Sequence, residues 1–264
     1  MGTNFAPSEL AAIGWRRIPT MHALKRINPL RKQLRRRIRA IANEQHSPIE
    51  RFSSNALQIN DAALDFQEKS YAYLENALSD NYYKALVSQF PKRRYFDPFY
   101  DMTKTYDWGF VWNRGKSDPQ HLHKFPALRA MYDHVRSEEF CQMVTNLCGD
   151  GIQRECYSVD TTYAKSGAYL TPHQDAVIED NTGSAFVNFI FFVSGNGDPF
   201  TGGGTSFSSD AEMKHLLLVP STLNNSIVMY RSQKDIWHGF RPLGKGQTRQ
   251  AVIFQYCSKS FRNS

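Results

Sequence analysis

The chain has 264 residues, of which 41% are hydrophobic, 13% aromatic and 22% charged. This composition is typical of a globular protein with one large domain or two small ones, and it excludes collagenous, low-complexity and wholly disordered chains. No apolar stretch reaches the roughly 18 residues that a membrane-spanning helix needs, which excludes an integral membrane protein. The four cysteines form no C-x-x-C pair and no secretory signal opens the sequence, so we expect a cytoplasmic protein without disulfides or a thiolate zinc site.

The net charge of +7 is concentrated near the N-terminus. Ten of the 32 basic residues and no acidic residue lie between Leu10 and Asn43, which leaves 22 basic and 25 acidic residues elsewhere. One apolar stripe recurs in this arm at helical spacing: Ile27, Leu30, Leu34, Ile38 and Ile41. A basic amphipathic helix of this kind packs on its own domain, lies on an anionic membrane surface through residues 16–41, or binds nucleic acid or a protein. These alternatives stay open.

Helices are predicted before the strands. Residues 1–60 form the arm and a polar linker, and residues 61–264 form the domain. Two helices are expected between 61 and 90, divided at 79–81, and a third over 126–147, ended by the turn at Gly149. The stretch 92–125 is aromatic and irregular. In it Trp108 and Trp112 are expected in the core or at a substrate mouth, and His121-x-His123 is expected in a surface or substrate-facing loop.

After Gly151 the apolar pattern changes to a period of two, which is typical of strands. Eight strands are predicted near 153–164, 167–171, 185–193, 204–207, 214–219, 226–230, 235–238 and 248–257. The absence of a βαβ alternation in this pattern argues against a doubly wound fold. We therefore expect a mainly β (α+β) fold, in which a double-sheet sandwich or barrel follows a helical region.

Three residues in this β region have the types and spacing of a metal site. Side chains at positions i and i+2 of a strand point to the same face, so His173 and Asp175 can bind one ion. His238 lies near another predicted strand end, which a barrel can bring opposite the first. Two imidazoles and one carboxylate on one side of a metal form the facial triad of non-haem Fe(II) and O2 chemistry.

A fourth residue, Arg249, opens the last predicted strand. A guanidinium on an otherwise apolar strand is a costly buried cation unless an anion accompanies it. A dicarboxylate cosubstrate supplies such an anion, because its distal carboxylate can form a bidentate pair with the guanidinium.

The complete ordered set is Tyr163-x3-Gly167-x5-His173-x-Asp175, then Gly202-Gly203-Gly204-Thr205, then His238-Gly239-Phe240-x-Pro242-Leu243-x2-Gly246-x2-Arg249. This set resembles the Fe(II)- and 2-oxoglutarate-dependent oxygenases, and within them the prolyl 4-hydroxylase-like branch. The resemblance covers roughly residues 150–258. It implies a double-stranded β-helix (jelly-roll) core, with the helices from about residue 78 onward as a supporting layer.

The resemblance also implies a set of ligands. Iron is expected on His173, Asp175 and His238, 2-oxoglutarate with its distal carboxylate on Arg249, and O2 at the remaining position, with ascorbate as an optional stimulant. Tyr163 matches the family position whose phenol often hydrogen-bonds the cosubstrate. Asn188 alternates with apolar residues on one strand face and is expected to point into the barrel, either as a cosubstrate contact or as a satisfied buried amide.

Two comparisons with the resembled family narrow the expected reaction. Asp175 is present where related halogenases lack a carboxylate, which favours hydroxylation. Gln255 stands where nucleic-acid demethylases of the superfamily carry a second arginine, which argues against a nucleic-acid substrate.

We therefore expect a dioxygenase that hydroxylates an unactivated C–H bond of a small molecule, natural product or glycolipid, with succinate and CO2 as co-products. Two alternatives stay open. One is a protein prolyl hydroxylase, and the other is a non-catalytic jelly-roll module that binds a metal.

Overall fold

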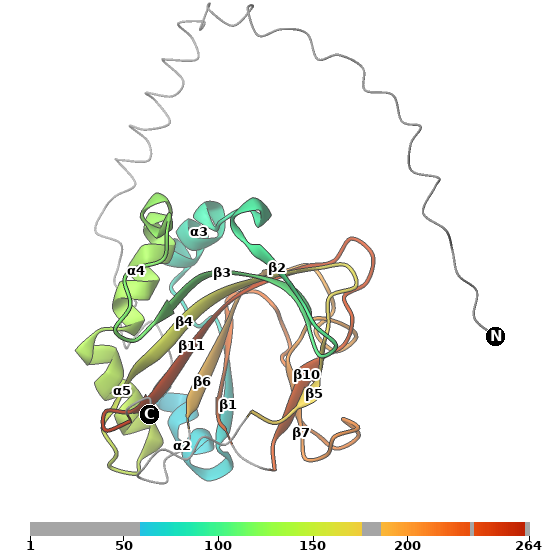
Figure 1. Ribbon diagram of the computed structural model, residues 1–264. Coiled ribbons are helices and arrows are strands. Elements are labelled where there is room, and N and C mark those ends of the chain that lie inside the picture. The colour runs from blue at the N-terminus through green and yellow to red at the C-terminus, as the bar shows by residue number, and fades with distance from the viewer. Residues whose placement is uncertain (1–58, 176–185, 233–234, 262–264) are drawn as a thin grey trace, which may run out of the picture. The chain divides into compact units, whose positions relative to one another are not determined.

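Two antiparallel sheets form the core of the computed structural model, which describes residues 59–175, 186–232 and 235–261 (Figure 1). The expectations for the basic arm, including residues 16–41, lie outside the described residues. The large sheet has seven strands in the order β1-β9-β6-β11-β4-β3-β2, and the small sheet has four in the order β5-β10-β7-β8. This arrangement confirms the predicted mainly β fold with a jelly-roll core.

The strands of the large sheet are β1 (Tyr71–Glu75), β2 (Asp97–Tyr100), β3 (Thr105–Asn113), β4 (Arg154–Lys165), β6 (Val187–Gly195), β9 (Ser226–Arg231) and β11 (Thr248–Ser258). Those of the small sheet are β5 (Leu170–His173), β7 (Ser206–Ser208), β8 (Leu216–Leu218) and β10 (Trp237–Phe240). The helices are α2 (Ile59–Lys69), α3 (Asp80–Gln89), α4 (Pro126–Val135) and α5 (Glu138–Cys148), with short 3-10 turns at Arg93–Tyr95 and Leu122–Lys124. Within the described ranges, no helix is both long and apolar enough to cross a bilayer.

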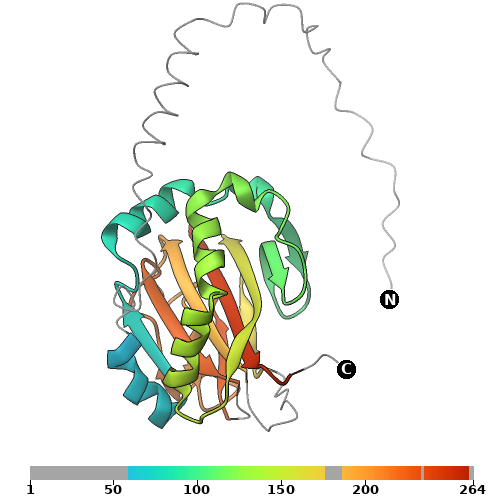
Figure 2. The ribbon, with the colours of Figure 1, turned by 90° about the vertical axis from the view of Figure 1, so that its left-hand side faces the viewer.

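The two faces of the large sheet have different neighbours. The helices cover one face, which is the face towards the viewer in Figure 2, and the small sheet faces the other (Figures 1 and 2). Successive side chains of a strand alternate between faces, so β11 presents Val252 and Phe254 to the helices and Arg249 and Ala251 to the small sheet. We call these the outer face and the inner face.

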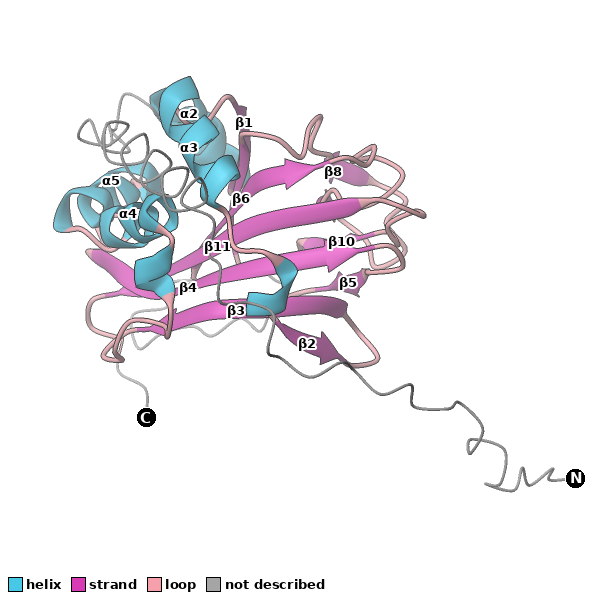
Figure 3. Cartoon of the chain, turned by 90° about the horizontal axis from the view of Figure 1, so that it is seen from above, coloured by secondary structure: helices cyan, strands magenta, loops and turns pink. Residues whose placement is uncertain are grey.

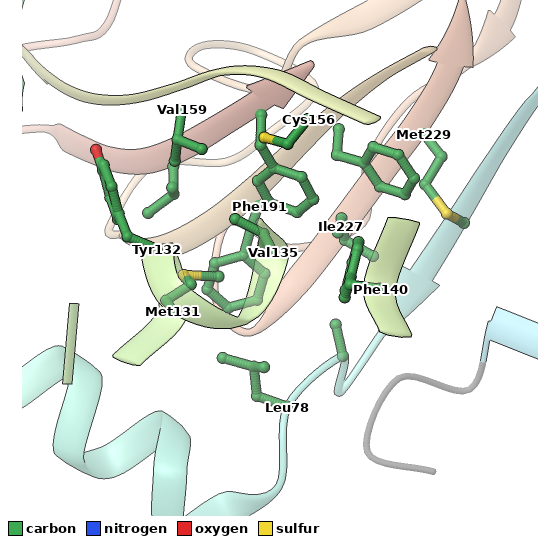
Figure 4. Packing of buried hydrophobic residues seen from close by; sticks show 14 of the residues in the cluster. Leu78, Met131, Tyr132, Val135, Phe140, Cys156, Val159, Phe191, Ile227 and Met229 are labelled. Atoms are coloured by element: carbon green, nitrogen blue, oxygen red, sulfur yellow. The ribbon is translucent and has the colours of Figure 1, made fainter. Parts of the chain in front are cut away.

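The outer face carries the main hydrophobic core. Phe254 stacks on Phe189 of β6, with ring centroids 5.0 Å apart, and Phe140 of α5 packs edge-on against it. Figure 4 shows how Phe140, Met131 and Val135 meet the sheet residues beneath them. This core holds the large sheet in place without contributing polar groups to the interior of the barrel.

The predicted helix 126–147 is two helices. The chain breaks at residues 136–137, where the hydroxyl of Ser137 accepts a hydrogen bond from the backbone N–H of Phe140 and caps α5. Gly149 ends α5 in the left-handed conformation, as its sequence position predicts. The break lets α4 and α5 each lay a separate apolar side on the sheet.

Two further predictions on the N-terminal half are wrong. Residues 71–75, expected as helix, form the edge strand β1, because Ser70 takes a positive φ of 67° and the chain then pairs with β9. The stretch 92–125, expected as irregular, contains the hairpin of β2 and β3 (Figure 3). The eight strands predicted after Gly151 are all present, with the second shifted to Leu170–His173.

Truncation of the central ring of the outer face tests this account of the core. Phe254→Ala should lower the free energy of unfolding by about 3–5 kcal/mol, because it removes a fully buried ring and leaves a cavity. Urea denaturation monitored by circular dichroism measures the change. The matched control is Leu64→Ala on α2, whose side chain is 77% exposed, and a shift of more than about 0.5 kcal/mol is not expected there. Equal effects of the two substitutions would contradict the assignment of the core.

Candidate metal centre

His173, Asp175 and His238 converge at one end of the small sheet. His173 ends β5 and pairs directly with His238 of β10, and Asp175 lies two residues beyond β5. One ligand atom from each residue lies within 4.8 Å of the other two. The carboxylate Oδ1 of Asp175 is 3.7 Å from Nε2 of His173 and 3.6 Å from Nε2 of His238. Among the described residues, no other group of histidine, cysteine and carboxylate side chains converges in this way.

A glycine makes this close approach between strands feasible. Gly239 follows His238, and a Cβ there would lie 2.7 Å from the carbonyl oxygen of Leu170 on β5. Any larger residue would push β10 away from β5 and separate the two imidazoles.

Hydrogen bonds and burial prepare both imidazoles for a metal. Nδ1 of His173 lies 3.0 Å from the carbonyl oxygen of Thr171, so it carries the proton and leaves Nε2 free to bind. His238 is buried beside the ring of Phe207, and burial lowers its pKa to about 4 against the opposing charge of Asp175. His238 is therefore a neutral imidazole at neutral pH, which is the form that ligates.

The second oxygen of Asp175 is held by three donors. Oδ2 accepts hydrogen bonds from the hydroxyl of Tyr230 at 2.9 Å, the amide of Asn188 at 3.2 Å and the hydroxyl of Ser232 at 3.4 Å. This leaves Oδ1 facing both histidines, as a monodentate ligand requires.

Asn188 points into the barrel as predicted, but the structure assigns it to Asp175 rather than to a cosubstrate. Its Nδ2 donates to both Asp175 and Ser232, which uses both amide hydrogens. Of the two expectations for this residue, the satisfied buried amide matches the geometry.

Arg249 is a buried cation inside the barrel. Its guanidinium lies over the rings of Phe240 and Phe192, at 4.5 and 5.0 Å from their centroids, and donates to the hydroxyl of Thr205 at 3.0 Å. In the described part of the chain no carboxylate forms an ion pair with it, and its Nε has no acceptor. Burial lowers its pKa to about 10, which still leaves it charged at neutral pH. A buried cation in this setting is a receptor for an anion.

The prediction for Tyr163 needs a correction. Tyr163 pairs with Gln250, whereas Ala164 pairs with Arg249, so Tyr163 lies on the outer face of the sheet. Its ring packs 5.8 Å from that of Phe96 in the outer core and cannot share a ligand with Arg249 from there.

The phenol on the inner face is Tyr106 of β3. Its ring lies 6.0 Å from that of Phe240, and its strand neighbour Asp107 pairs with Tyr163, which puts Tyr106 on the opposite face from Tyr163. Burial raises the pKa of Tyr106 to about 12, and the positive charge of Arg249 opposes that shift because the two groups are close. The alternation of Tyr106, Trp108 and Phe110 in the sequence was a strand signal that could have identified this residue.

Trp108 and Trp112 lie on opposite faces of β3, although their spacing predicts one face. Trp108 pairs with Thr162 and Trp112 with Val159, because a bulge containing Phe110 at a φ of 51° inserts one residue between them. Trp112 packs in the outer core beneath Arg136, and Trp108 is on the inner face.

The chain is similar to known proteins in structure and not in sequence. No protein-family model matches it, and no curated protein sequence matches it. Solved structures do. A prolyl hydroxylase from Trichoplax adhaerens, in complex with a hypoxia-inducible-factor peptide fragment, superposes with a TM-score of 0.57 at 10% identity, over 76% of this chain and 89% of that one. A Pseudomonas putida prolyl-4-hydroxylase gives 0.54 at 13% identity, over 76% and 99%.

A third similar structure comes from natural-product biosynthesis. The non-haem α-ketoglutarate-dependent epimerase SnoN of nogalamycin biosynthesis gives a TM-score of 0.52 at 10% identity, over 76% of this chain and 82% of that one. These structures define the class of fold: this chain has the jelly roll of the 2-oxoglutarate/Fe(II) oxygenases, in the form that prolyl hydroxylases have. The expected resemblance is confirmed in the fold.

One partly buried carboxylate on the inner face, whose Oδ1 is enclosed, lies outside the triad. Asp160 of β4 pairs with the inner-face residue Ile253, and burial raises its pKa to about 7, with the nearby ammonium of Lys104 opposing. A carboxyl group whose pKa is higher in the folded state than in the unfolded chain favours folding most when it is protonated. That contribution is complete below about pH 4 and is lost as the pH rises through 7.

Asp160→Asn should therefore stabilise the protein at pH 8 by about 1–3 kcal/mol and leave its stability unchanged near pH 4. The reason is that the amide carries no charge for burial to penalise. Chemical denaturation of both proteins at the two pH values measures this difference. Asp65→Asn on the exposed side of α2 is the control and should change stability by less than about 0.5 kcal/mol at either pH. A destabilised Asp160→Asn protein at pH 8 would show that the carboxylate is stabilised in the fold.

Proposed function

We propose that this protein is an Fe(II)- and 2-oxoglutarate-dependent dioxygenase that hydroxylates an unactivated C–H bond of an organic substrate. One oxygen atom of O2 enters the C–H bond, and the other converts 2-oxoglutarate to succinate and CO2. The observation that carries this proposal is the pairing of two features in one barrel. A two-histidine, one-carboxylate site lies at the end of the small sheet, and a buried guanidinium without an ion-pair partner among the described residues lies on the inner face of the large sheet.

The donor set fits Fe(II). Two imidazole nitrogens and one carboxylate oxygen, each held by a further hydrogen bond or by packing, would occupy one side of the metal and leave the other open. Iron in this site would bind 2-oxoglutarate and O2 and supply the oxidising power for the substrate C–H bond.

The protein's own residues would position the cosubstrate. Arg249 would hold the distal carboxylate of 2-oxoglutarate with two parallel hydrogen bonds, and the free Nε–H supplies one of the donors. The phenol of Tyr106 and the hydroxyl of Thr205 lie beside the guanidinium and would complete the carboxylate's shell. The rings of Phe240 and Phe192 exclude water from this end.

Among substrate classes we favour a small molecule, a natural product or a glycolipid over a peptide. The similarity in fold to SnoN supports a small molecule or natural product. The similarity in fold to the Trichoplax enzyme, whose structure contains a peptide, supports a protein prolyl hydroxylase as the alternative. Incubation with candidate peptides and metabolites, analysed for a gain of about 16 Da, distinguishes them. The inner-face residue Gln255, where related demethylases carry arginine, supports a substrate other than nucleic acid.

An anaerobic titration with Fe(II) and 2-oxoglutarate tests the cofactor assignment without a known substrate. A saturable visible charge-transfer band is expected. His238→Ala should abolish it, and Arg249→Gln should raise the apparent Kd for 2-oxoglutarate by about 10- to 100-fold, because a charged hydrogen-bonded pair contributes about 1.5–3 kcal/mol.

Arg241→Gln is the matched control, since Arg241 follows β10 and its guanidinium lies over the ring of Phe200, away from the inner face. Its titration should match that of the wild type. A folded wild-type protein that gives no band would remove the enzyme proposal and favour a non-catalytic module.

We also propose that the protein is cytoplasmic and that residues 16–41 place it at anionic membranes. The support is the sequence alone: ten basic residues, no acidic residue and one apolar stripe. The protein should float with phosphatidylserine vesicles and not with neutral phosphatidylcholine vesicles, and glutamine at residues 35, 36, 37 and 39 should abolish flotation. Equal flotation of both proteins would contradict this role of the arm.

A further inference from the structure

One wall of the barrel carries polar groups that neither the metal nor 2-oxoglutarate uses. Lys104, Tyr106 and Trp108 occupy alternating positions along and just before β3, so they share its inner face. Trp108 pairs with Thr162 of β4, and Asp160 is the next inner-face residue along β4. Trp108 and Asp160 are therefore diagonal neighbours on adjacent strands.

Strand β11 lies between this wall and the metal centre. Asp160 pairs with Ile253 of β11, and Asn188, which holds the ligand Asp175, pairs with Gln255. Ile253 and Gln255 are consecutive inner-face residues of β11. Asp160 is consequently two strands away from Asn188, the residue that holds Asp175, and is displaced from it by one inner-face residue along the strands. The negative charges of Asp160 and Asp175 both contribute to raising the pKa of Tyr106.

Two atoms of the wall are buried without a hydrogen-bond partner among the described residues. They are the acceptor Oδ1 of Asp160 and the donor Nε1 of Trp108. Buried polar atoms in folded proteins are nearly always paired, because an unpaired one costs about 1–3 kcal/mol. Neighbouring atoms of opposite hydrogen-bonding character that do not pair with each other fit a ligand that carries both a donor and an acceptor.

Lys104 adds a cation to the same wall. Its Nζ lies 4.4 Å from the ring centroid of Trp108 and 4.7 Å from that of Phe99, and the ammonium forms no ion pair with a carboxylate in the described part of the chain. The wall therefore offers a carboxyl group with a buried oxygen at Asp160 and, beside Trp108, a cation together with an N–H donor.

A cavity of about 710 Å³ borders the β2–β3 hairpin, and Trp108 lines it together with Asp97, Val111 and His121. The lining does not include Lys104, Tyr106 or Asp160. His121 packs beside Tyr95 on the side of the outer core.

We propose that this wall binds the substrate and that the substrate is a free α-amino acid. Its ammonium group binds Asp160, and its carboxylate binds the Nε1–H of Trp108 and the ammonium of Lys104. The inference rests on the proposed dioxygenase function and names its substrate class. Burial raises the pKa of Asp160 to about 7 in the empty wall, and a bound ammonium would return it to the charged carboxylate.

The test uses the full chain loaded with Fe(II) and 2-oxoglutarate in air and measures succinate formation. The probes are the twenty free L-amino acids, each beside its N-acetyl derivative, which lacks the ammonium, and its methyl ester, which lacks the carboxylate. At least one free amino acid should stimulate succinate formation, and both of its derivatives should fail to do so. Stimulation by a derivative equal to that by its parent would overturn the proposal.

Two substitutions then locate the binding groups. Asp160→Asn should raise the KM for the stimulating amino acid by about 10- to 100-fold, and Trp108→Phe by about 3- to 10-fold, because they remove a charged and a neutral hydrogen bond. Trp112→Phe is the matched control, since Trp112 lies on the same strand but on the outer face and should leave the KM unchanged. An unchanged KM in Asp160→Asn would also overturn the proposal.

The charge-transfer band of the wild type distinguishes a failure of the substrate assignment from a failure of the dioxygenase proposal. A band without stimulation by any amino acid overturns the substrate assignment and leaves the dioxygenase proposal in place. Absence of the band overturns the dioxygenase proposal itself.

Discussion

The guanidinium of Arg249 is the constraint around which the barrel is organised. It is a full positive charge inside the protein, and a thiol, amide or apolar side chain at the same place would be less costly. The two phenyl rings beside it contribute about 0.5–2 kcal/mol each through cation–π attraction, and the hydroxyl of Thr205 contributes one hydrogen bond. These contacts offset only part of the desolvation of the charge, so the fold keeps a site that an anionic ligand completes.

The strands keep this charge apart from the apolar core by simple alternation. On β11 and β4 every second residue faces the helices, and these residues form the stacked aromatic core that supplies stability. The intervening residues face the small sheet and supply the polar groups. A change of one residue in register would exchange the two sets, which is why Tyr163 and Ala164, adjacent in sequence, have unrelated roles.

Two carboxylates on the inner side of the barrel illustrate how surroundings divide their roles. Asp175 has one oxygen fixed by three donors, so its other oxygen is presented to the two imidazoles as a permanent ligand. Asp160 has a buried oxygen with no donor among the described residues, and burial raises its pKa. The protein supplies the hydrogen bonds that orient Asp175 as a metal ligand. The buried oxygen of Asp160 has no such donor, and we assign this carboxyl group to substrate binding.

Much of the fold and the triad could be predicted from the sequence, because a period of two, glycine turns and the His-x-Asp pattern are local signals. The expected iron ligands and the expected 2-oxoglutarate contact followed from residue types: two histidines with a carboxylate, and an arginine on an otherwise apolar strand. The edge strand at Tyr71 could not be predicted in this way, since it depends on pairing with the distant strand β9. The β2–β3 hairpin had a local signal in the alternation of Tyr106, Trp108 and Phe110, which the bulge at Phe110 interrupts. The role predicted for Tyr163 is wrong because the spacing of the family motif identifies a position along the chain, whereas strand pairing decides which face of the sheet the side chain occupies. Asp160 carries no motif, and only its burial reveals it.

The most direct test of the central claim is a crystal structure of the protein with Mn(II) in place of Fe(II) and with 2-oxoglutarate. The account predicts one metal ion bound by Nε2 of His173, Nε2 of His238 and Oδ1 of Asp175, with the distal carboxylate of 2-oxoglutarate paired to Arg249 beside Tyr106. A metal bound elsewhere, or 2-oxoglutarate whose distal carboxylate avoids Arg249, would contradict it.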